Sequence, residues 1–317
     1  MAKLLKIVFM GTPDFGVPCF RLMVESGYKP ILCITQPDRP KGRNKKLQPP
    51  AIKLEAEKFG IAVAQPEDVN NEEFLQKLEQ LVPDIIVTVA YGGYLKKRIR
   101  KIAKFGCINL HPSLLPKYRG SAPMNFSLFN GDKKTGISIF KIVAKMDAGP
   151  IIYQREVEIG AAENYSSLYK RLSILGAEDM INVLQMYENN QVDLIPQDHT
   201  QATFSNKIFK PDMCLDWDNC AENIQNRVRG LGEYPGITAS FREKRIKIIE
   251  LDIIDETSPK ASGTIIEVIK NIGILVATKD KNIIIKKLQP AGKKIMTAHA
   301  FNLGARILEG EKFENGF

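Results

Sequence analysis

The chain reads CINLHPSLLPKYRG over residues 107–120, an apolar stretch that runs into a proline-rich loop. Side chains of a β-strand point alternately to opposite faces, so a strand here puts Asn109 and His111 on one face. The apolar Ile108 and Leu110 then point the other way and can anchor in a core. An amide and an imidazole held at the end of such a strand can donate hydrogen bonds to an oxyanion that forms during a reaction.

On both sides of this stretch, apolar runs alternate with helical patterns. The run 84–90 is almost continuously apolar, which is typical of a strand covered on both faces. Alternating strands and helices form right-handed βαβ units. We therefore expect an α/β fold with a Rossmann-like, mostly parallel sheet. Its expected strands are 4–10, 30–35, 61–64, 84–90, 106–111, 137–143 and 151–159, and its expected helices are 18–26, 51–59, 70–81 and 165–187.

The pattern changes after a polar region without periodicity, residues 190–206, which we interpret as a linker. It separates a predicted catalytic domain, residues 1–189, from a second domain, residues 207–317. In the second domain a helical pattern precedes five short strand patterns, which predict a small OB-like β-barrel, with a plain β-sandwich as the alternative. The expected helix is 220–231 and the expected strands are 237–241, 244–254, 263–268, 273–278 and 282–288.

Composition narrows the class of protein. The 317 residues are 44% hydrophobic and 26% charged, as in an ordinary soluble protein. No apolar run reaches the ~18 residues of a membrane helix, and the N-terminus does not fit a signal peptide. We expect a cytoplasmic protein without a membrane partner. The net charge of +9 favours a polyanionic partner.

The number and spacing of the cysteines and histidines argue against disulfides and metal sites. The spacings of the five cysteines fit neither a disulfide framework nor a metal site, so reduced, buried thiols are expected. Only three histidines occur, and no metal site is predicted. No role is assigned to His199 or His299, whereas His111 is a candidate catalytic residue. Cys107 shares a strand face with His111, which leaves a thiol mechanism as an alternative.

Two turns bear on the site. Residues 146–149 read MDAG, and Asp147 can support the charged form of a catalytic histidine, or it can simply cap the turn. Residues 11–16 read GTPDFG after the first expected strand, where doubly wound folds bind ligands. This turn is neither a dinucleotide fingerprint nor a P-loop, so a dehydrogenase or ATP-dependent function is disfavoured.

Two segments concentrate the positive charge. Residues 36–46 carry five basic side chains and one acidic one, and two prolines and a glycine there argue against a helix. We expect a flexible arm that orders on RNA. Residues 96–104 carry six basic side chains and no acidic one, which fits either a solvated helix face or a nucleic-acid contact.

These motifs together resemble the methionyl-tRNA formyltransferase family, in order and nearly from end to end. The resemblance rests on MGTPDF (10–15), TQPDRPKGR (35–43), VAYG (89–92), INLHPSLLP (108–116), RGSAP (119–123), MDAG (146–149) and LQPAGKK (288–294). It implies transfer of the formyl group of 10-formyltetrahydrofolate, a co-substrate, to the α-amino group of methionine on initiator methionyl-tRNA. Tetrahydrofolate is then the second product, and a monomer without a metal is expected.

The resemblance also implies roles for particular residues. Asn109 and protonated His111 would stabilise the oxyanion, and Asp147 would hold His111 and share in proton transfer. The implied folate-binding residues are Ser113, Leu114, Leu115 and Pro116 on one side and Tyr91, Gly92 and Leu95 on the other. The implied tRNA-binding residues are Arg39, Lys41, Arg43, Lys45 and Lys46.

Two other functions fit parts of the pattern. A formyltransferase acting on a sugar nucleotide or on glycinamide ribonucleotide would use the same Asn109, His111 and Asp147 without RNA. An RNA-binding protein without activity on this scaffold is the alternative from another class, and the intact set of three residues argues against it.

Overall fold

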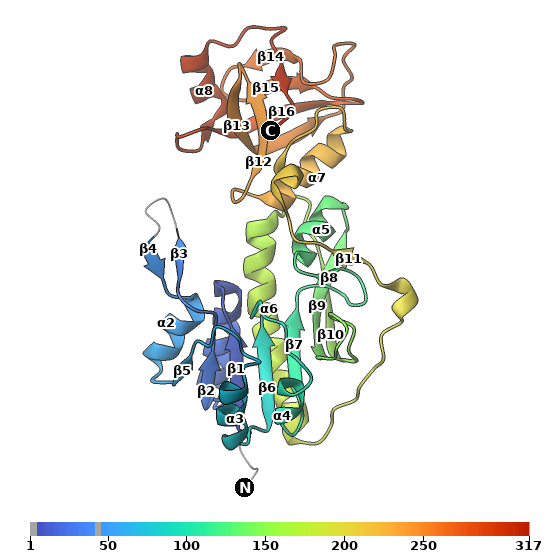
Figure 1. Ribbon diagram of the computed structural model, residues 1–317. Coiled ribbons are helices and arrows are strands. Elements are labelled where there is room, and N and C mark those ends of the chain that lie inside the picture. The colour runs from blue at the N-terminus through green and yellow to red at the C-terminus, as the bar shows by residue number, and fades with distance from the viewer. Residues whose placement is uncertain (1–4, 42–45, 317) are drawn as a thin grey trace. The chain divides into compact units, whose positions relative to one another are not determined.

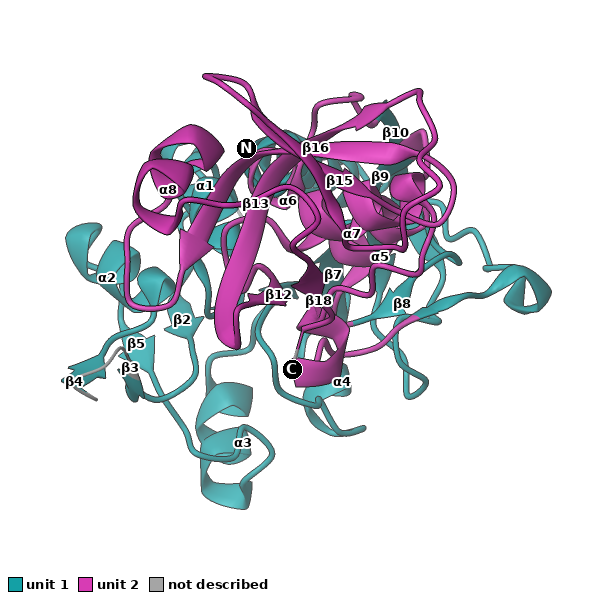
Figure 2. Ribbon diagram, turned by 90° about the horizontal axis from the view of Figure 1, so that it is seen from above, with its two compact units in different colours: residues 1–120, 135–158, 169–204 teal, residues 121–134, 159–168, 205–317 magenta. Residues whose placement is uncertain are grey.

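The computed structural model describes residues 5–41 and 46–316. Two compact units interleave along the chain, and Figure 2 colours them separately. Unit 1 comprises residues 1–120, 135–158 and 169–204, and unit 2 comprises residues 121–134, 159–168 and 205–317.

Unit 1 is built on a sheet of seven strands in the order β10-β9-β7-β6-β1-β2-β5 (Figure 1). The pairs β7–β6, β6–β1, β1–β2 and β2–β5 are parallel, and β9 runs antiparallel to β7. The mostly parallel α/β sheet is thereby confirmed. The strands are β1 (Ile7–Gly11), β2 (Leu32–Ile34), β5 (Val63–Ala64), β6 (Ile85–Val89), β7 (Cys107–His111), β9 (Lys134–Lys141) and β10 (Ile151–Glu158).

Helices follow these strands much as the sequence predicts. Each central strand β1 and β6 is buried at every position, because helices cover both faces of the sheet. On one face Val8, Ile86 and Cys107 pack with Leu75 and Leu78. The helices with residues in this unit are α1 (Val17–Glu25), α2 (Ala51–Lys58), α3 (Glu72–Gln80), α4 (Ile99–Ile102) and α6 (Tyr165–Glu188), with short 3-10 helices at Asp14–Gly16 and His199–Gln201.

The alternation predicted for β7 is present. Leu110 points toward α6, where a Cβ atom at Gly176 would lie 2.7 Å from the Leu110 side chain. Cys107 points to the opposite face, and its Sγ donates to the carbonyl of Ile99, 3.6 Å away. Asn109 and His111 therefore lie on the face opposite α6, as expected.

Unit 2 contains one curled antiparallel sheet in the order β14-β15-β16-β13-β12-β18, with β17 paired to β16. Irregular register between β13 and β16 near Glu250 bends these strands, which helps the sheet to curl. The described strands form this half-barrel, the OB-like prediction, and no two-sheet sandwich. The strands are β12 (Ile237–Phe241), β13 (Lys244–Ile254), β14 (Ile265–Ile269), β15 (Gly273–Ala277), β16 (Asn282–Pro290), β17 (Met296–Thr297) and β18 (Phe313–Glu314).

The core of unit 2 is aromatic and aliphatic. Trp217 stacks on Phe313, with ring centroids 5.6 Å apart, under the curled sheet. Helices α5 and α7 meet closely, and Asn125 Nδ2 donates to the carbonyl of Gly230 over 2.8 Å. The helices of this unit are α5 (Pro123–Phe129), α7 (Ala221–Leu231) and α8 (Ala298–Ala305), with a 3-10 helix at Lys210–Met213.

Two small pairings differ from the sequence expectation. The basic segment is not helical, as predicted, but its ends form strands β3 (Arg39–Lys41) and β4 (Lys46–Gln48), which pair antiparallel. The sequence analysis did not anticipate this pairing, and the flexible arm that orders on RNA stays a prediction. A second short pair joins β8 (Arg119–Gly120) to β11 (Phe204–Ser205). Among the described residues, no helix combines the length and apolar character that crossing a bilayer requires.

Candidate active site

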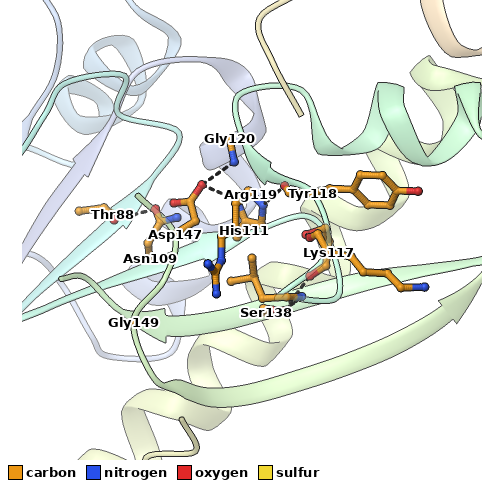
Figure 3. A network of polar contacts seen from close by, with 12 residues as sticks. Thr88, Asn109, His111, Lys117, Tyr118, Arg119, Gly120, Ser138, Asp147 and Gly149 are labelled. Atoms are coloured by element: carbon orange, nitrogen blue, oxygen red, sulfur yellow. Dashed lines mark hydrogen bonds and ion pairs between the residues drawn. The ribbon is translucent and has the colours of Figure 1, made fainter. Parts of the chain in front are cut away.

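The imidazole of His111 lies at the carboxyl end of β7 and is only 4% exposed (Figure 3). Its Nε2 is 2.9 Å from the carbonyl oxygen of Tyr118. A carbonyl only accepts hydrogen bonds, so Nε2 carries a proton and Nδ1 is the nitrogen available for chemistry. Nδ1 faces Oδ2 of Asp147 at 3.9 Å.

The carboxylate of Asp147 comes from the turn between β9 and β10. Its Oδ2 also accepts a hydrogen bond from the backbone N–H of Gly120 over 2.8 Å (Figure 3). The backbone of Asp147 has φ of +48°, a left-handed conformation that costs about 1–2 kcal/mol for a residue with a side chain. Asp147 thus lies beside His111, which its predicted role requires.

Asn109 lies two residues before His111 on the same strand. Its neighbour in the β6–β7 register is Thr88, whose hydroxyl donates to Asn109 Oδ1 over 2.7 Å. This bond uses the acceptor end of the amide, so the NH₂ group remains as a donor. The structure therefore brings together the three predicted residues, two hydrogen-bond donors and one carboxylate.

Hydrogen bonds of buried serines hold the predicted folate loop, residues 113–116. Ser113 is fully buried, and its hydroxyl donates to the carbonyl of Lys117 over 2.7 Å. Ser138, which pairs with His111 in the β7–β9 ladder, donates to the carbonyl of Ser113 and accepts from the N–H of Leu115. Leu115 is buried, whereas Leu114 and Pro116 are half-buried, and the Leu114 side chain packs over Gly136 of β9.

The second predicted folate segment is held at both ends. Tyr91 and Leu95 are buried in the core, and the exposed Gly92 between them has φ of +84°. The hydroxyl of Thr12, from the turn after β1, donates to the carbonyl of Tyr91 over 2.8 Å. The amide of Asn70 accepts from the N–H of Lys96 and donates to the carbonyl of Tyr94.

Three of the five predicted tRNA-binding residues lie in the paired strands β3 and β4. Arg39 is exposed and contacts Glu67, with Nη2 3.1 Å from Oε2. Lys41 ends β3, and the exposed Lys46 begins β4. Arg43 and Lys45 fall outside the described residues.

The thiol alternative loses its support. Cys107 is 1% exposed, and burial raises the pKa of its thiol to about 12, so the nucleophilic thiolate is not available near neutral pH. Over the ranges that the structure describes, no group of three His, Cys, Asp or Glu side chains is arranged to hold a metal ion.

Sequence reasoning missed the residues that support the site. Thr88, Tyr118 and Gly120 act through hydrogen bonds that no local pattern indicates. His199, to which no role was assigned, has Nδ1 2.9 Å from Nη2 of the fully buried Arg119. Burial lowers the pKa of the Arg119 guanidinium, and the charge of nearby Asp147 opposes that shift. The proline-rich loop before Arg119 was the only available hint.

Comparisons with known proteins identify the family of the chain. A formyl transferase family model matches residues 5–184, and the model of the formyl transferase C-terminal domain matches residues 207–306. The methionyl-tRNA formyltransferase of Kosmotoga olearia is 44% identical over 97% of this chain and 99% of its own. The enzyme of the same name from Bacillus subtilis is 41% identical over 96% of each chain.

Solved structures share the fold at low identity. An N-formyltransferase from Helicobacter canadensis, in complex with folinic acid and dTDP-3-aminofucose, superposes with a TM-score of 0.69 at 17% identity over 90% of this chain and 99% of that one. HypX from Aquifex aeolicus, in complex with tetrahydrofolic acid, has a TM-score of 0.62 at 14% identity over 95% of this chain and 47% of that one. With both domain models matched and relatives above 40% identity along nearly the whole length, the chain belongs to the methionyl-tRNA formyltransferase family.

Proposed function

We propose that the protein transfers the formyl group of 10-formyltetrahydrofolate to the α-amino group of methionine carried by initiator tRNA, at the start of translation. The observation that carries this proposal is the identity of 44% to a methionyl-tRNA formyltransferase along 97% of the chain. The grouping of Asn109, His111 and Asp147 supports it, because formyl transfer to an amine needs an oxyanion site and a route for a proton.

Asn109 and His111 stabilise the charge that develops on the formyl oxygen. When the amine attacks the formyl carbon, that oxygen becomes an oxyanion, and the Asn109 NH₂ group and a protonated His111 Nδ1 are donors on the same strand face. Removing one such donor typically costs about 10²–10³ in rate.

Asp147 completes the set from its turn. Its carboxylate, 3.9 Å from His111 Nδ1, stabilises the imidazolium and keeps the ring in place. The attacking amine must lose a proton and the N10 leaving group must gain one. Asp147 and His111 together can carry this proton, and such assistance is worth roughly 10²–10⁴ in rate.

The folate lies, in this proposal, along the two segments that flank the site. Within the predicted set, Gly92 is exposed and Leu114 and Pro116 are half-buried. We expect these three residues to supply the surface that contacts the folate. The other members of the set have buried side chains and shape the loops from inside the protein: Ser113, Leu115, Tyr91 and Leu95.

The β3–β4 hairpin and the second domain, residues 207–317, bind the tRNA. Arg39, Lys41, Arg43, Lys45 and Lys46 give the hairpin a run of positive charge for phosphates of the acceptor stem. We place the protein in the cytoplasm, where charged initiator tRNA is used, and expect it to act as a monomer.

The test is formylation of initiator methionyl-tRNA by the purified protein with 10-formyltetrahydrofolate, detected by mass spectrometry of N-formylmethionine. Wild type should form product, and His111→Ala should abolish it. The triple variant Arg39→Ala, Lys41→Ala, Arg43→Ala should raise KM for tRNA while leaving the rate at saturation nearly unchanged.

An acceptor other than tRNA is the outcome that would overturn the substrate. Formylation of an amino-sugar nucleotide or of glycinamide ribonucleotide, with no product on tRNA, would keep the chemistry of Asn109, His111 and Asp147 and reject the proposed acceptor. The likeness to the N-formyltransferase from Helicobacter canadensis, at 17% identity, supports the shared fold alone.

A further inference from the structure

The segment predicted as a linker, residues 190–206, contains a buried polar side chain. Gln197 is 7% exposed, although its neighbours Asp198 and Gln201 are exposed. A buried amide in a polar connecting segment is costly unless its donors and acceptor are all bonded. The partners of Gln197 therefore indicate why it is buried.

Both ends of the Gln197 amide are used within the candidate active site. Nε2 donates to the carbonyl of Asp147 over 2.9 Å and to the carbonyl of Gly149 over 2.7 Å. Oε1 accepts from Arg119, with 2.6 Å to Nη2 and 3.1 Å to Nε. One side chain thus connects the Asp147 turn to the strand that follows Tyr118.

The two bonds from Nε2 of Gln197 reach the turn at Asp147, where the backbone has an unfavourable conformation. Asp147 has φ of +48°, and such a conformation persists when its surroundings over-determine it. A Cβ atom at Gly149 would lie 1.7 Å from the carbonyl of Lys141, so the turn already packs closely on β9. Figure 3 shows Asp147 between Gly120 and His111, where a shift of the turn would move the carboxylate off both.

The segment 190–206 also contacts the backbone that supports His111. The carbonyl of Thr203 accepts from the N–H of Arg119, and its hydroxyl accepts from the N–H of Tyr118, each over 2.9 Å. Tyr118 in turn supplies the carbonyl that fixes His111. Gln197 and Thr203 therefore contact the backbone that supports Asp147 and His111.

We propose that Gln197 is a positioning residue for formyl transfer: it fixes the Asp147 turn so that the carboxylate stays opposite His111. This inference rests on the proposed function. It goes beyond it by giving Gln197, in the segment predicted as a linker, a part in the chemistry, whereas a linker would only join two domains.

The test compares Gln197→Glu with Gln201→Glu in single-turnover formylation. Gln197→Glu keeps the length of the side chain and an acceptor for Arg119, but it replaces the NH₂ donor with a carboxylate oxygen that faces the carbonyls of Asp147 and Gly149, and it adds a negative charge, as the control Gln201→Glu also does. We expect the rate to fall by about 10²-fold, as small displacements of a catalytic group can do. Gln201 is exposed in the same segment and its amide donates to Oδ2 of Asp198, so Gln201→Glu is the matched control and should keep its rate.

A double-mutant cycle separates positioning from folding. In an Asp147→Asn background the carboxylate is gone, so Gln197→Glu should lower the rate much less than it does in wild type. Equal losses in both backgrounds would overturn the proposal, and so would wild-type rates for Gln197→Glu. If wild type forms no formyl product on tRNA, the proposed function fails first, and this inference fails with it.

A second variant covers a failure of Gln197→Glu to fold. Gln197→Asn keeps the amide but shortens its reach by one methylene, so thermal unfolding should stay close to that of wild type and the rate should fall by an intermediate amount. A wild-type rate for a folded Gln197→Asn protein would also contradict the proposal.

Discussion

The hydroxyl of Thr88 orients the Asn109 amide from the neighbouring strand. Thr88→Val keeps the branched shape and removes that hydrogen bond, which is worth about 1 kcal/mol, so kcat should fall about fivefold. Rapid-quench measurement of formylmethionine at saturating substrates checks this, and KM for the folate should change little.

Thr35→Val is the matched control for that change. Thr35 is also fully buried, and its hydroxyl has no hydrogen-bond partner among the described residues. Removing an unsatisfied hydroxyl is neutral or stabilising, so kcat should be unchanged and Tm equal or higher. An equal loss of kcat in both variants would mean that Thr88 acts on stability alone.

At the residue scale, the sequence was sufficient to predict the side chains that carry the chemistry, but not the residues that hold them in place. Period-two alternation placed Asn109 and His111 on one face, which the structure confirms, and the MDAG turn made Asp147 a candidate to which the family resemblance then gave a role. The contact with Tyr118 spans 7 residues and that with Gln197 spans 50, and nothing local encodes which backbone carbonyl a side chain will meet.

Helices α1 and α2 are joined by an ion pair of a buried carboxylate. Glu55 has a side chain only 5% exposed, and Arg21 Nη2 donates to its Oε2 over 2.9 Å. The Arg21 hydrogen bond, with help from Lys58, holds the pKa of Glu55 below its ordinary value against the opposing effect of burial. Glu55→Gln should therefore lower the free energy of unfolding at pH 7 by about 1–2 kcal/mol.

The pH dependence of that loss has a definite sign. Because the folded-state pKa of Glu55 is lowered, its stabilisation is complete above the ordinary value of about 4.3 and disappears as the pH falls through the lowered pKa. In urea unfolding, the difference between wild type and Glu55→Gln should be larger at pH 7 than at pH 3. A constant difference would assign the effect to packing.

Strand β9 supports the predicted folate loop through Ser138. Ser138→Ala leaves the Leu115 N–H and the Gln154 amide without this acceptor, at a cost of about 1–3 kcal/mol. The loop should loosen, and KM for 10-formyltetrahydrofolate should rise about tenfold while kcat changes less. Ser173→Ala, at a buried serine that bonds within α6, serves as the control with normal KM.

At the element scale, strands with a strong periodic pattern were predicted well and irregular elements were not. β12 and β13 have the predicted bounds, because each is an apolar run closed by turn residues. The β3–β4 hairpin was missed because Pro37 and Pro40 suggested an irregular loop, yet only backbone pairing between Arg39–Lys41 and Lys46–Gln48 decides its conformation. Helix α5 was missed since its short apolar run has no polar face.

At the scale of the whole molecule, the positive charge is spread along the chain. Residues 1–206 carry 27 basic and 21 acidic side chains, and residues 207–317 carry 18 and 15, so both parts are positive. A protein that neutralises phosphates releases counterions, and log Kd then rises linearly with log salt, by about 0.9 per phosphate contact on duplex nucleic acid. The affinity for initiator tRNA should fall steeply as salt rises.

The β3–β4 hairpin should account for part of that salt dependence. The exposed Arg39–Glu67 pair is worth little, so the Arg39 guanidinium is free to exchange Glu67 for a phosphate. In filter binding from low to high salt, the double variant Arg39→Ala, Lys46→Ala should reduce the slope by about 1–2. Lys77→Ala, which removes an exposed charge paired with Glu73 on α3, should leave the slope unchanged. An equal slope in all three proteins would place the tRNA contact elsewhere than the hairpin.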